Sequence, residues 1–513
     1  MLTVGIWLPI DFRGHWKGEG IARIVKYALE GATRLPEAQS MRFRLYVTGW
    51  AAAEVTEDLQ SLAPAIASGQ ITIVSFKQDR WTWYFLRLLR RLERGTPAAK
   101  AARGAAPRVG KQSLLSEAWR RLAPKISKIL LKPYYKIHNI CVVQTGNVVA
   151  LCQRRDLRLN TQDANMHGIN VWWVPYVGAE GVLDLKAPIV AHFFDFMAVE
   201  YPSGWPAADP GMLSLYNRFR AGFKQVSHVI ATSQHAVRDQ LQPHFGMDPA
   251  RITIIPNPYP SYYRTLVSSV AAGQDWPTIR REAGNIIQSY IQRGIAEDRW
   301  PLKDVYTQNY LLPYYASIDW ASTTFLFAPT QDRPYKNLSR FVDLIEDLVR
   351  REGRDIKLVL TAGLDMTSDH RLARMVYERN LTRHVISLPR VPDEVHAALF
   401  AAASMSVHAS YIEGGIATAN FIEGLYLRCP AIYGQGPHTL EAAALFPEAY
   451  ADYLFLPDRP DQLKELVLDV LENREEAVER QMQVHAFAQK EFDATTVVAR
   501  YLDVFRAVAA AAE

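Results

Sequence analysis

The chain alternates short apolar runs with amphipathic helical patterns, in two separate blocks. The first block contains LTVGIWLPI, a helical pattern at about 21–35, FRLYVTG, ITIVSF, APIVAHFFDF, HVIATSQHAVRDQL and RITIIPNPYP. The second contains TTFLFAP, LSRFVDLIEDLVRR, IKLVLTAG, HVISLP, DEVHAALFAAA and MSVHAS. Strands that alternate with helices form parallel sheets covered by helices. We therefore predict an α/β protein of two such domains, with a ligand cleft at the carboxyl ends of the strands.

The length of the chain also favours more than one domain, because 513 residues exceed what one hydrophobic core usually organises. We predict an N-terminal domain over residues 1–260 and a C-terminal domain over residues 323–484. A last helix, at about 485–513, is expected to pack back on the N-terminal domain. Residues 261–322 are rich in aromatic side chains and lack the alternation, so we expect a helical insertion or an extended linker there.

The composition is typical of a soluble globular protein, with 49% apolar and 22% charged residues. The three cysteines have no metal-ligand spacing, which suits the reducing cytoplasm. The opening run MLTVGIWLPIDF lacks a basic leader and is predicted to be a strand. The sequence contains no stretch of ~18 uncharged apolar residues that could span a membrane. We expect a cytoplasmic protein that can bind peripherally to the inner face of the cytoplasmic membrane.

A basic segment at about 77–138 follows the first three strand candidates. Between Lys77 and Lys136 there are sixteen Lys or Arg and three Asp or Glu, a net charge of +13. The whole chain has a net charge of +5, so the residues outside this segment have a net charge of −8. Leucines and aromatic residues share one helical face there and arginines the other, as in helices that lie on anionic membranes. We predict a basic helical insertion that contacts membrane through residues 80–136. The alternative is a helix packed on the domain with a solvated basic face. Nucleic acid is not expected, because no recognition motif accompanies the charge.

The loop DRPYKN in the second block places Arg333 and Lys336 just before a helix, for which Asn337 is a good N-cap. A helix N-terminus presents unpaired N–H groups and a partial positive charge. Two cations placed there can bind a diphosphate. The alternative is a solvated loop with ordinary surface cations.

Two glutamates, Glu413 and Glu423, lie in SYIEGGIATANFIEGLYLRCPAIYG, a stretch otherwise fit for burial. Carboxylates are costly to bury without partners. Glu413 follows a predicted strand and precedes Gly414 and Gly415, whose N–H groups can turn into the cleft. Glu423 lies in the short helix that follows. The two acids either bind a ligand or cap local backbone donors.

The order of these motifs resembles the retaining glycosyltransferases of family 4, which have the GT-B fold of two Rossmann-like domains facing across a cleft. The resemblance covers about 185–260 and 323–450. It depends on RPYKN, LVLTAG, VISLPRVPDEV, Ser410, Glu413, Gly414, Glu423 and Pro430. Nine residues separate the two glutamates, more than is usual in that family. The additional residues fall in GGIATANF, the loop that would face the donor sugar.

The resemblance implies a role for each motif in binding a nucleotide sugar. Glu423 would accept hydrogen bonds from the ribose hydroxyls, and Glu413 with the N–H groups after it would hold the transferred sugar. Arg333 and Lys336 would neutralise the leaving diphosphate. The candidate catalytic residues are Arg333, Lys336, Glu413, His192 and Asp195. The candidate donor-binding residues are Gly20, Arg333, Lys336, Asn337, Pro389, Arg390, Val391, Ser410, Glu413, Gly414, Gly415, Ile416 and Glu423. A single His in an aromatic segment such as AHFFDF is equally an ordinary core residue.

The same resemblance implies a retaining hexosyltransferase, for mannose or glucose, that uses a UDP- or GDP-sugar and a glycan or lipid-linked saccharide acceptor. Bacterial cell-surface polysaccharide or lipopolysaccharide synthesis is the expected setting. No cofactor and no metal are expected, and the sequence has no Asp-x-Asp motif. Two alternatives stay open: a catalytically inactive GT-B scaffold at the membrane, and a GT-B sugar-nucleotide epimerase.

Overall fold

The computed structural model describes residues 1–8, 20–49, 51–76, 159–179, 181–201, 210–258, 273–297, 300–302, 304, 306–366, 370–416 and 419–512. The predicted basic insertion at about 77–138, with its membrane-contact segment 80–136, lies outside the described residues.

The N-terminal half of the chain forms a parallel seven-stranded sheet in the order β3-β2-β1-β4-β5-β6-β7. In chain order the strands are β1 (Leu2–Leu8), β2 (Met41–Val47), β3 (Ile71–Ser75), β4 (Val171–Val174), β5 (Ile189–Phe193), β6 (His228–Ala231) and β7 (Ile252–Ile254). The central strands β1 and β4 pair Val4 with Val171, and the strand order reverses between them.

Helices pack against this sheet, so alternate strand residues enter different cores. Ile6 of β1 packs in one core with α1, whereas Trp7 packs in another with Phe223 of α8. The helices of this half are α1 (Gly20–Arg34), α2 (Ala52–Asp58), α3 (Ala63–Ala67), α7 (Met197–Glu200), α8 (Pro210–Gln225) and α9 (Gln242–Phe245). A π-helical turn at Ala236–Leu241 precedes α9.

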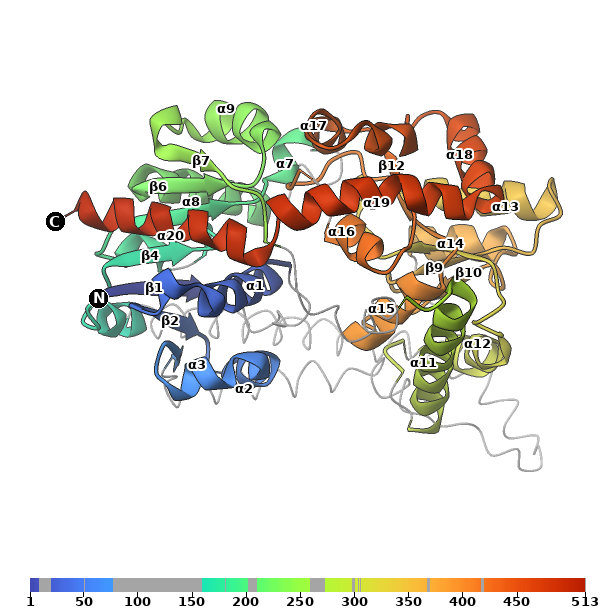
Figure 1. Cartoon of the computed structure of the whole chain (residues 1–513), viewed down its shortest axis with the longest axis horizontal. Coiled ribbons are helices and arrows are strands. Elements are labelled where there is room, and N and C mark those ends of the chain that lie inside the picture. The colour runs from blue at the N-terminus through green and yellow to red at the C-terminus, as the bar shows by residue number, and fades with distance from the viewer. Residues whose placement is uncertain are drawn as a thin grey trace, which may run out of the picture.

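The last helix, α20 (Ala494–Ala510), lies against α1 and returns the chain to the N-terminal half (Figure 1). Val498 of α20 is buried in the same core as Val25 of α1. Gly31 permits this close contact, because a Cβ there would lie 2.6 Å from the carbonyl oxygen of Ala494. The N-terminal core is therefore completed by the last segment of the sequence.

The C-terminal half contains a parallel six-stranded sheet in the order β10-β9-β8-β11-β12-β13. Its strands are β8 (Phe325–Ala328), β9 (Lys357–Leu360), β10 (Val385–Ser387), β11 (Met405–His408), β12 (Ala431–Gly434) and β13 (Leu454–Phe455). The order reverses between β8 and β11, which are paired through Leu326 and Met405. Loops that leave two such strands diverge and open a crevice, the usual ligand position in open α/β sheets.

The helices around this sheet follow their sequence patterns. In α13, Phe341, Ile345 and Leu348 are fully buried, as the helical period predicts. Ile287 of α11 shares a core with Phe400 of α15, so α11 belongs to the packed C-terminal half. The helices are α11 (Trp276–Ala296), α12 (Leu312–Ser317), α13 (Ser339–Arg350), α14 (Arg371–Glu378), α15 (Asp393–Ala402), α16 (Ala419–Tyr426), α17 (Pro437–Leu445), α18 (Pro460–Glu472) and α19 (Arg474–Glu491).

The predicted α/β fold with two parallel-sheet, Rossmann-like domains is confirmed. The sequence pattern does not identify β4, a central strand with the sequence VWWV, all four residues of which are buried. A parallel strand that is buried on both faces shows no alternation of apolar and polar residues. Only its pairing with β1 and β5 reveals it as a strand.

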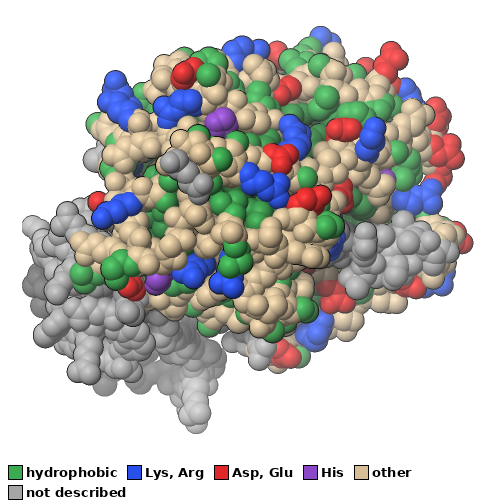
Figure 2. All heavy atoms as spheres, turned by 60° about the vertical axis from the view of Figure 1, so that its left-hand side comes forward, with side chains coloured by type: hydrophobic (Ala, Val, Ile, Leu, Met, Phe, Trp, Pro, Cys, Tyr) green, Lys and Arg blue, Asp and Glu red, His purple; other side chains and the backbone are tan. Residues whose placement is uncertain are grey.

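Among the described residues, every helix is too short or too polar to cross a membrane. On the face in Figure 2, basic and acidic side chains are interspersed over the described part of the surface.

Candidate active site

Lys336 and Glu413 meet at the crevice between β8 and β11. Lys336 ends a short 3-10 turn (Pro334–Lys336) in the loop after β8, and Glu413 lies in the loop after β11. The Lys336 ammonium forms an ion pair with Glu413 Oε1, and the two side chains are only 16% and 18% exposed. The N–H of Tyr411 donates to the carbonyl oxygen of Tyr335 at 2.9 Å and joins the two loops. The reversal of strand order thus brings together the two charges that the motifs predicted separately.

Glu413 is held as a carboxylate. Burial acts to raise its pKa. The charge of Lys336, then the charge of His438, and hydrogen bonds from Lys336 and Ser410 lower the pKa, and together they bring it below its usual value. Ser410 is itself buried directly after β11. The site therefore presents a charged, hydrogen-bonded acid that is largely withdrawn from solvent, where electrostatic interactions are stronger than in water.

A second carboxyl group, Asp195, faces this pair from the N-terminal domain. Asp195 follows β5, and its Oδ2 would lie 2.5 Å from a Cβ added to Gly414. Burial and the Glu413 charge raise the pKa of Asp195 to about 6, against the opposing effects of Lys336, the Met197 N–H and Arg333. A carboxyl group with such a pKa changes protonation state close to neutral pH, as a general acid or base must.

The other two residues of the DRPYKN loop lie at the rim. Arg333 is exposed, and its Nε donates to Gln331 Oε1 at 3.0 Å. The prediction that Asn337 caps α13 is wrong: Leu338 precedes that helix, and Asn337 directly follows the 3-10 turn with a φ of 51°. An N-cap needs an extended backbone, which this left-handed conformation excludes. The Asn337 Nδ2 is instead buried without a hydrogen-bond partner among the described residues.

The Glu413 loop also forms the contact between the domains. Thr232 Oγ1 and Ser233 Oγ, which follow β6, donate to the carbonyl oxygen of Gly414 at 2.5 and 3.1 Å. The N–H groups of Gln234 and His235 donate to the Glu441 carboxylate of α17, at 2.7 and 2.8 Å. Helix α17 lies where the two domains meet in Figure 1. The catalytic candidates thus depend on the relative position of the domains.

Glu423 lies in a second group, also built from both domains. It projects from α16 with a side chain 1% exposed, 3.5 Å from Arg23 Nη1 of α1 and 3.8 Å from His396 Nδ1 of α15. Burial, and then the Arg23 charge, lower the pKa of His396 to about 4, so this ring is neutral at pH 7. Gly20, the exposed first residue of α1, lies one helical turn before Arg23. Sequence reasoning missed Arg23, since nothing in α1 marks it as different from a surface arginine.

Three candidate donor-binding residues, Pro389, Arg390 and Val391, form the loop before α15. Pro389 is buried, Arg390 is exposed with a φ of 54°, and Val391 is half-buried. The loop leads into α15, whose first turn carries His396 toward Glu423. In the other candidate loop, Gly415 is half-buried and Ile416 packs in a separate apolar cluster with Phe421.

His192 lies apart from Lys336 and Glu413, in the aromatic core. Its ring stacks on Phe194 at 4.2 Å between centroids and meets Tyr501 of α20 edge-on at 5.5 Å. Burial lowers the pKa of His192 to about 3. Neither ring nitrogen has a hydrogen-bond partner among the described residues. This environment matches the alternative that was stated for His192, a core histidine.

Two buried histidines near Glu413 were missed by sequence reasoning. His408 is the last residue of β11, and His438 lies in the first turn of α17. Burial lowers their pKa values to about 3 and about 4, while the Glu413 charge opposes the shift in both. The position of His408 at the carboxyl end of a strand was a usable signal. That of His438 was not, because only the fold brings α17 to the Glu413 loop.

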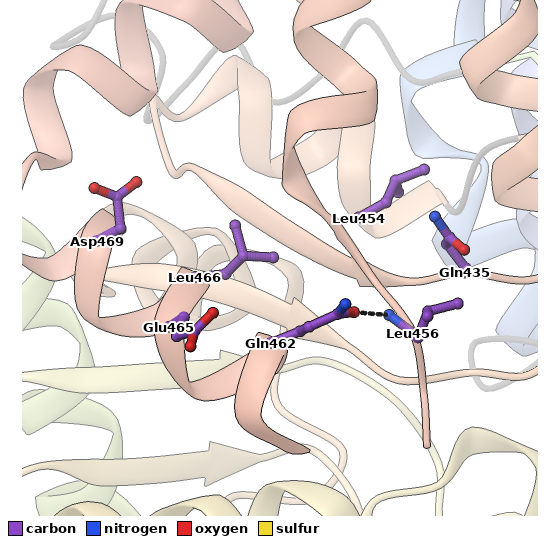
Figure 3. Close-up of a pocket in the computed structure, with 7 residues that line it drawn as sticks. All are labelled: Gln435, Leu454, Leu456, Gln462, Glu465, Leu466 and Asp469. Carbon is purple, nitrogen blue, oxygen red and sulfur yellow. Dashed lines mark hydrogen bonds between the residues drawn. The ribbon is translucent and has the colours of Figure 1, made fainter. Parts of the chain in front are cut away.

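Other sites on the described surface suit this chemistry less well. No three His, Cys, Asp or Glu side chains gather as a metal site within the part of the chain that the structure describes. A depression between β13 and α18 is lined by Gln435, Leu454, Leu456, Gln462, Glu465, Leu466 and Asp469 (Figure 3). Its charged lining residues are both acidic, which disfavours a diphosphate.

Comparisons with known proteins agree with this architecture. Residues 322–489 match the model of the family described as glycosyl transferases group 1. HepE of Anabaena, solved with UDP and glucose, is 12% identical with a TM-score of 0.55, over 99% of this chain and 100% of that one. WaaG, a glycosyltransferase involved in lipopolysaccharide biosynthesis, is 12% identical with a TM-score of 0.53, over 98% and 99%. Sucrose-phosphate synthase of Thermosynechococcus elongatus is 13% identical with a TM-score of 0.54, over 100% of both chains.

A search of curated protein sequences finds no match. Identities this low establish similarity of fold, while the family match covers the C-terminal domain. The chain therefore has the GT-B fold, and its residues 322–489 match the glycosyl transferases group 1.

Proposed function

We propose that the protein is a retaining, metal-independent hexosyltransferase of family 4. It transfers mannose or glucose from a UDP- or GDP-sugar to a glycan or lipid-linked saccharide. The setting is the synthesis of bacterial cell-surface polysaccharide or lipopolysaccharide. HepE was solved with UDP-glucose, which supports the donor class, and the involvement of WaaG in lipopolysaccharide biosynthesis supports the setting.

The Lys336–Glu413 ion pair carries this proposal. It lies at the strand-order reversal of the domain that matches the glycosyl transferases, and Asp195 faces it from the other domain. A cation and two carboxyl groups at one crevice suit a substrate with an anionic leaving group and hydroxyl groups. The ammonium would bind the diphosphate, and the carboxyl oxygens would accept hydrogen bonds from the sugar.

The transfer step follows from these positions. The bond between the sugar C1 and the diphosphate oxygen breaks, and its electrons pass to the diphosphate. Lys336 and, at the rim, Arg333 stabilise that charge. The acceptor hydroxyl forms the new bond to C1 on the same face, and the departing diphosphate takes its proton. Glu423 would meanwhile accept hydrogen bonds from the ribose hydroxyls. Arg23 of α1 lies beside Glu423 and would border the nucleotide from the N-terminal domain.

Donor binding tests the proposal directly. In a thermal-shift screen against UDP-, GDP- and ADP-sugars, we expect one UDP- or GDP-sugar to raise the melting temperature, because a ligand that binds only the folded state stabilises it. Glu423→Gln should lose most of that shift. Glu472→Gln, an exposed helix residue paired with Arg354 in the same domain, should keep it. If no nucleotide sugar shifts the wild-type protein, the proposal fails. Binding without release of nucleoside diphosphate would favour the scaffold alternative.

Membrane contact is a separate part of the proposal and depends on the sequence of the basic segment. Deletion of residues 80–136 should abolish co-sedimentation with vesicles that contain anionic phosphatidylglycerol, since each cation near the headgroups contributes ~1 kcal/mol. Binding of the full chain should also weaken as salt is raised. Equal sedimentation of the deletion variant and the full chain would contradict the assignment.

A further inference from the structure

Two tyrosines from different domains stack on each other at the edge of the candidate site. Tyr201 follows α7 in the N-terminal domain, and Tyr411 lies in the loop after β11. Their ring centroids are 5.9 Å apart, with 15° between the ring planes. Tyr411 is 37% exposed and Tyr201 is half-buried. Aromatic side chains commonly line the sites where proteins bind small ligands.

A buried apolar floor supports the Tyr201 ring. Met197, Tyr335 and Ile412 form a small cluster, each 4–7% exposed, and Tyr201 packs against it. The Tyr201 and Tyr335 rings meet edge-on at 6.5 Å. The Tyr411 N–H donates to the carbonyl oxygen of Tyr335 in this floor, and the Tyr411 ring stacks on Tyr201, so residues of both domains position the pair.

The floor connects the tyrosine pair to the reacting groups. The Lys336 ammonium lies 5.2 Å from the centre of the Tyr335 ring. Burial raises the pKa of Tyr335, and Lys336, Arg333, Glu413 and Asp195 all act on the same hydroxyl. Tyr411 is two residues from Glu413 in the sequence. A group lying on the tyrosines would therefore border the crevice where the sugar is transferred.

We infer that Tyr201 and Tyr411 form a stacking platform for a pyranose ring of the acceptor, an inference that depends on the proposed function. The C–H face of a pyranose is apolar and slightly positive, and it complements the negative face of an aromatic ring. Its hydroxyl edge would find acceptors in Asp195 and Glu413. An alkyl chain in the same place would offer no hydrogen-bond donor to either carboxyl group and would add no polar contact to offset their desolvation. The chemistry thus favours recognition of the acceptor by its sugar ring.

Saturation-transfer NMR on the full chain tests the platform, with methyl α-glucoside, methyl α-mannoside and methyl β-galactoside as probes. For at least one glycoside, the wild type should transfer saturation to the ring C–H protons. Tyr411→Leu and Tyr201→Leu, which keep apolar bulk without a ring, should weaken binding about tenfold or more. Tyr411→Phe should bind like the wild type. Tyr377→Ala, at an exposed tyrosine on α14, is the control.

The outcomes separate the platform from the proposed function. If the wild type binds none of the three glycosides, or if both Leu variants bind them as well as the wild type, the platform is refuted. Glycoside binding that depends on both rings would support it even where no nucleotide sugar binds, and the proposed function would then fail alone. If transfer activity is found, the Leu variants should raise the KM for the saccharide at least about tenfold and that for the donor far less.

Discussion

Lys336→Ala is expected to lower the rate of sugar transfer by about 10²–10³-fold, the usual effect of removing one well-placed donor from a developing negative charge. The ammonium is largely withdrawn from solvent and paired with Glu413, so its charge is poorly screened. Without it, the donor diphosphate would meet the carboxyl groups of Glu413 and Asp195, and of the two cations in the DRPYKN loop Arg333 at the rim would remain. Initial rates of nucleoside diphosphate release at saturating donor measure the loss.

The same substitution should change the pH dependence in a defined direction. Lys336 lowers the pKa values of both Glu413 and Asp195, so its removal raises both, and the two groups hold their protons to higher pH. The acidic limb of the pH–rate profile should therefore shift to higher pH. Lys464→Ala is the matched control, since it removes a lysine paired with Asp347 and Glu352 on the surface. It should change the rate by less than about twofold. A Lys336→Ala variant that keeps more than about a tenth of the activity would contradict the assigned role.

Gly414→Val should lower the rate by about 10²-fold, because displacement of a catalytic group by about 1 Å can cost that much. A Cβ at residue 414 would lie 2.5 Å from both the Phe194 carbonyl oxygen and Asp195 Oδ2. The first of these is backbone and cannot rotate away. The Glu413 loop must therefore shift, or the two domains must separate. Overpacking of this kind also destabilises a fold by about 1–3 kcal/mol.

The control for this prediction is Gly363→Ala. There the nearest atoms to an added Cβ lie at 3.5 and 3.9 Å, which is ordinary van der Waals contact. Rates should be compared below the melting temperature of each variant, so that loss of folded protein is not read as loss of activity. Thr232→Val gives an intermediate case, since it removes one hydrogen bond to Gly414 and adds nothing to the loop. Full activity of Gly414→Val would show that domain contact at this loop is not needed.

Local sequence pattern was enough to predict several strands of the second sheet and the helix α13 that packs against it. The helical period of α13 and the apolar runs of β8, β9 and β11 are visible in single stretches, because each period reflects one buried face. The motif order also placed Lys336 and Glu413 at the carboxyl ends of predicted strands, where parallel sheets bind ligands. The role of Asn337 as a cap was mispredicted, because residue preference does not reveal the left-handed backbone that ends the preceding turn.

The sequence by itself determined the α/β class, the two blocks of alternating strands and helices, and the residue types available to bind a diphosphate and a sugar. Only the tertiary structure decided which of them meet. Asp195 and Glu413 are more than two hundred residues apart in the chain, as are the Gln234 and His235 N–H groups from Glu441. Arg23 reaches Glu423 from α1 of the N-terminal domain. Such contacts depend on the order of strands in the two sheets and on the relative position of the domains. Local sequence periodicity indicates neither of these.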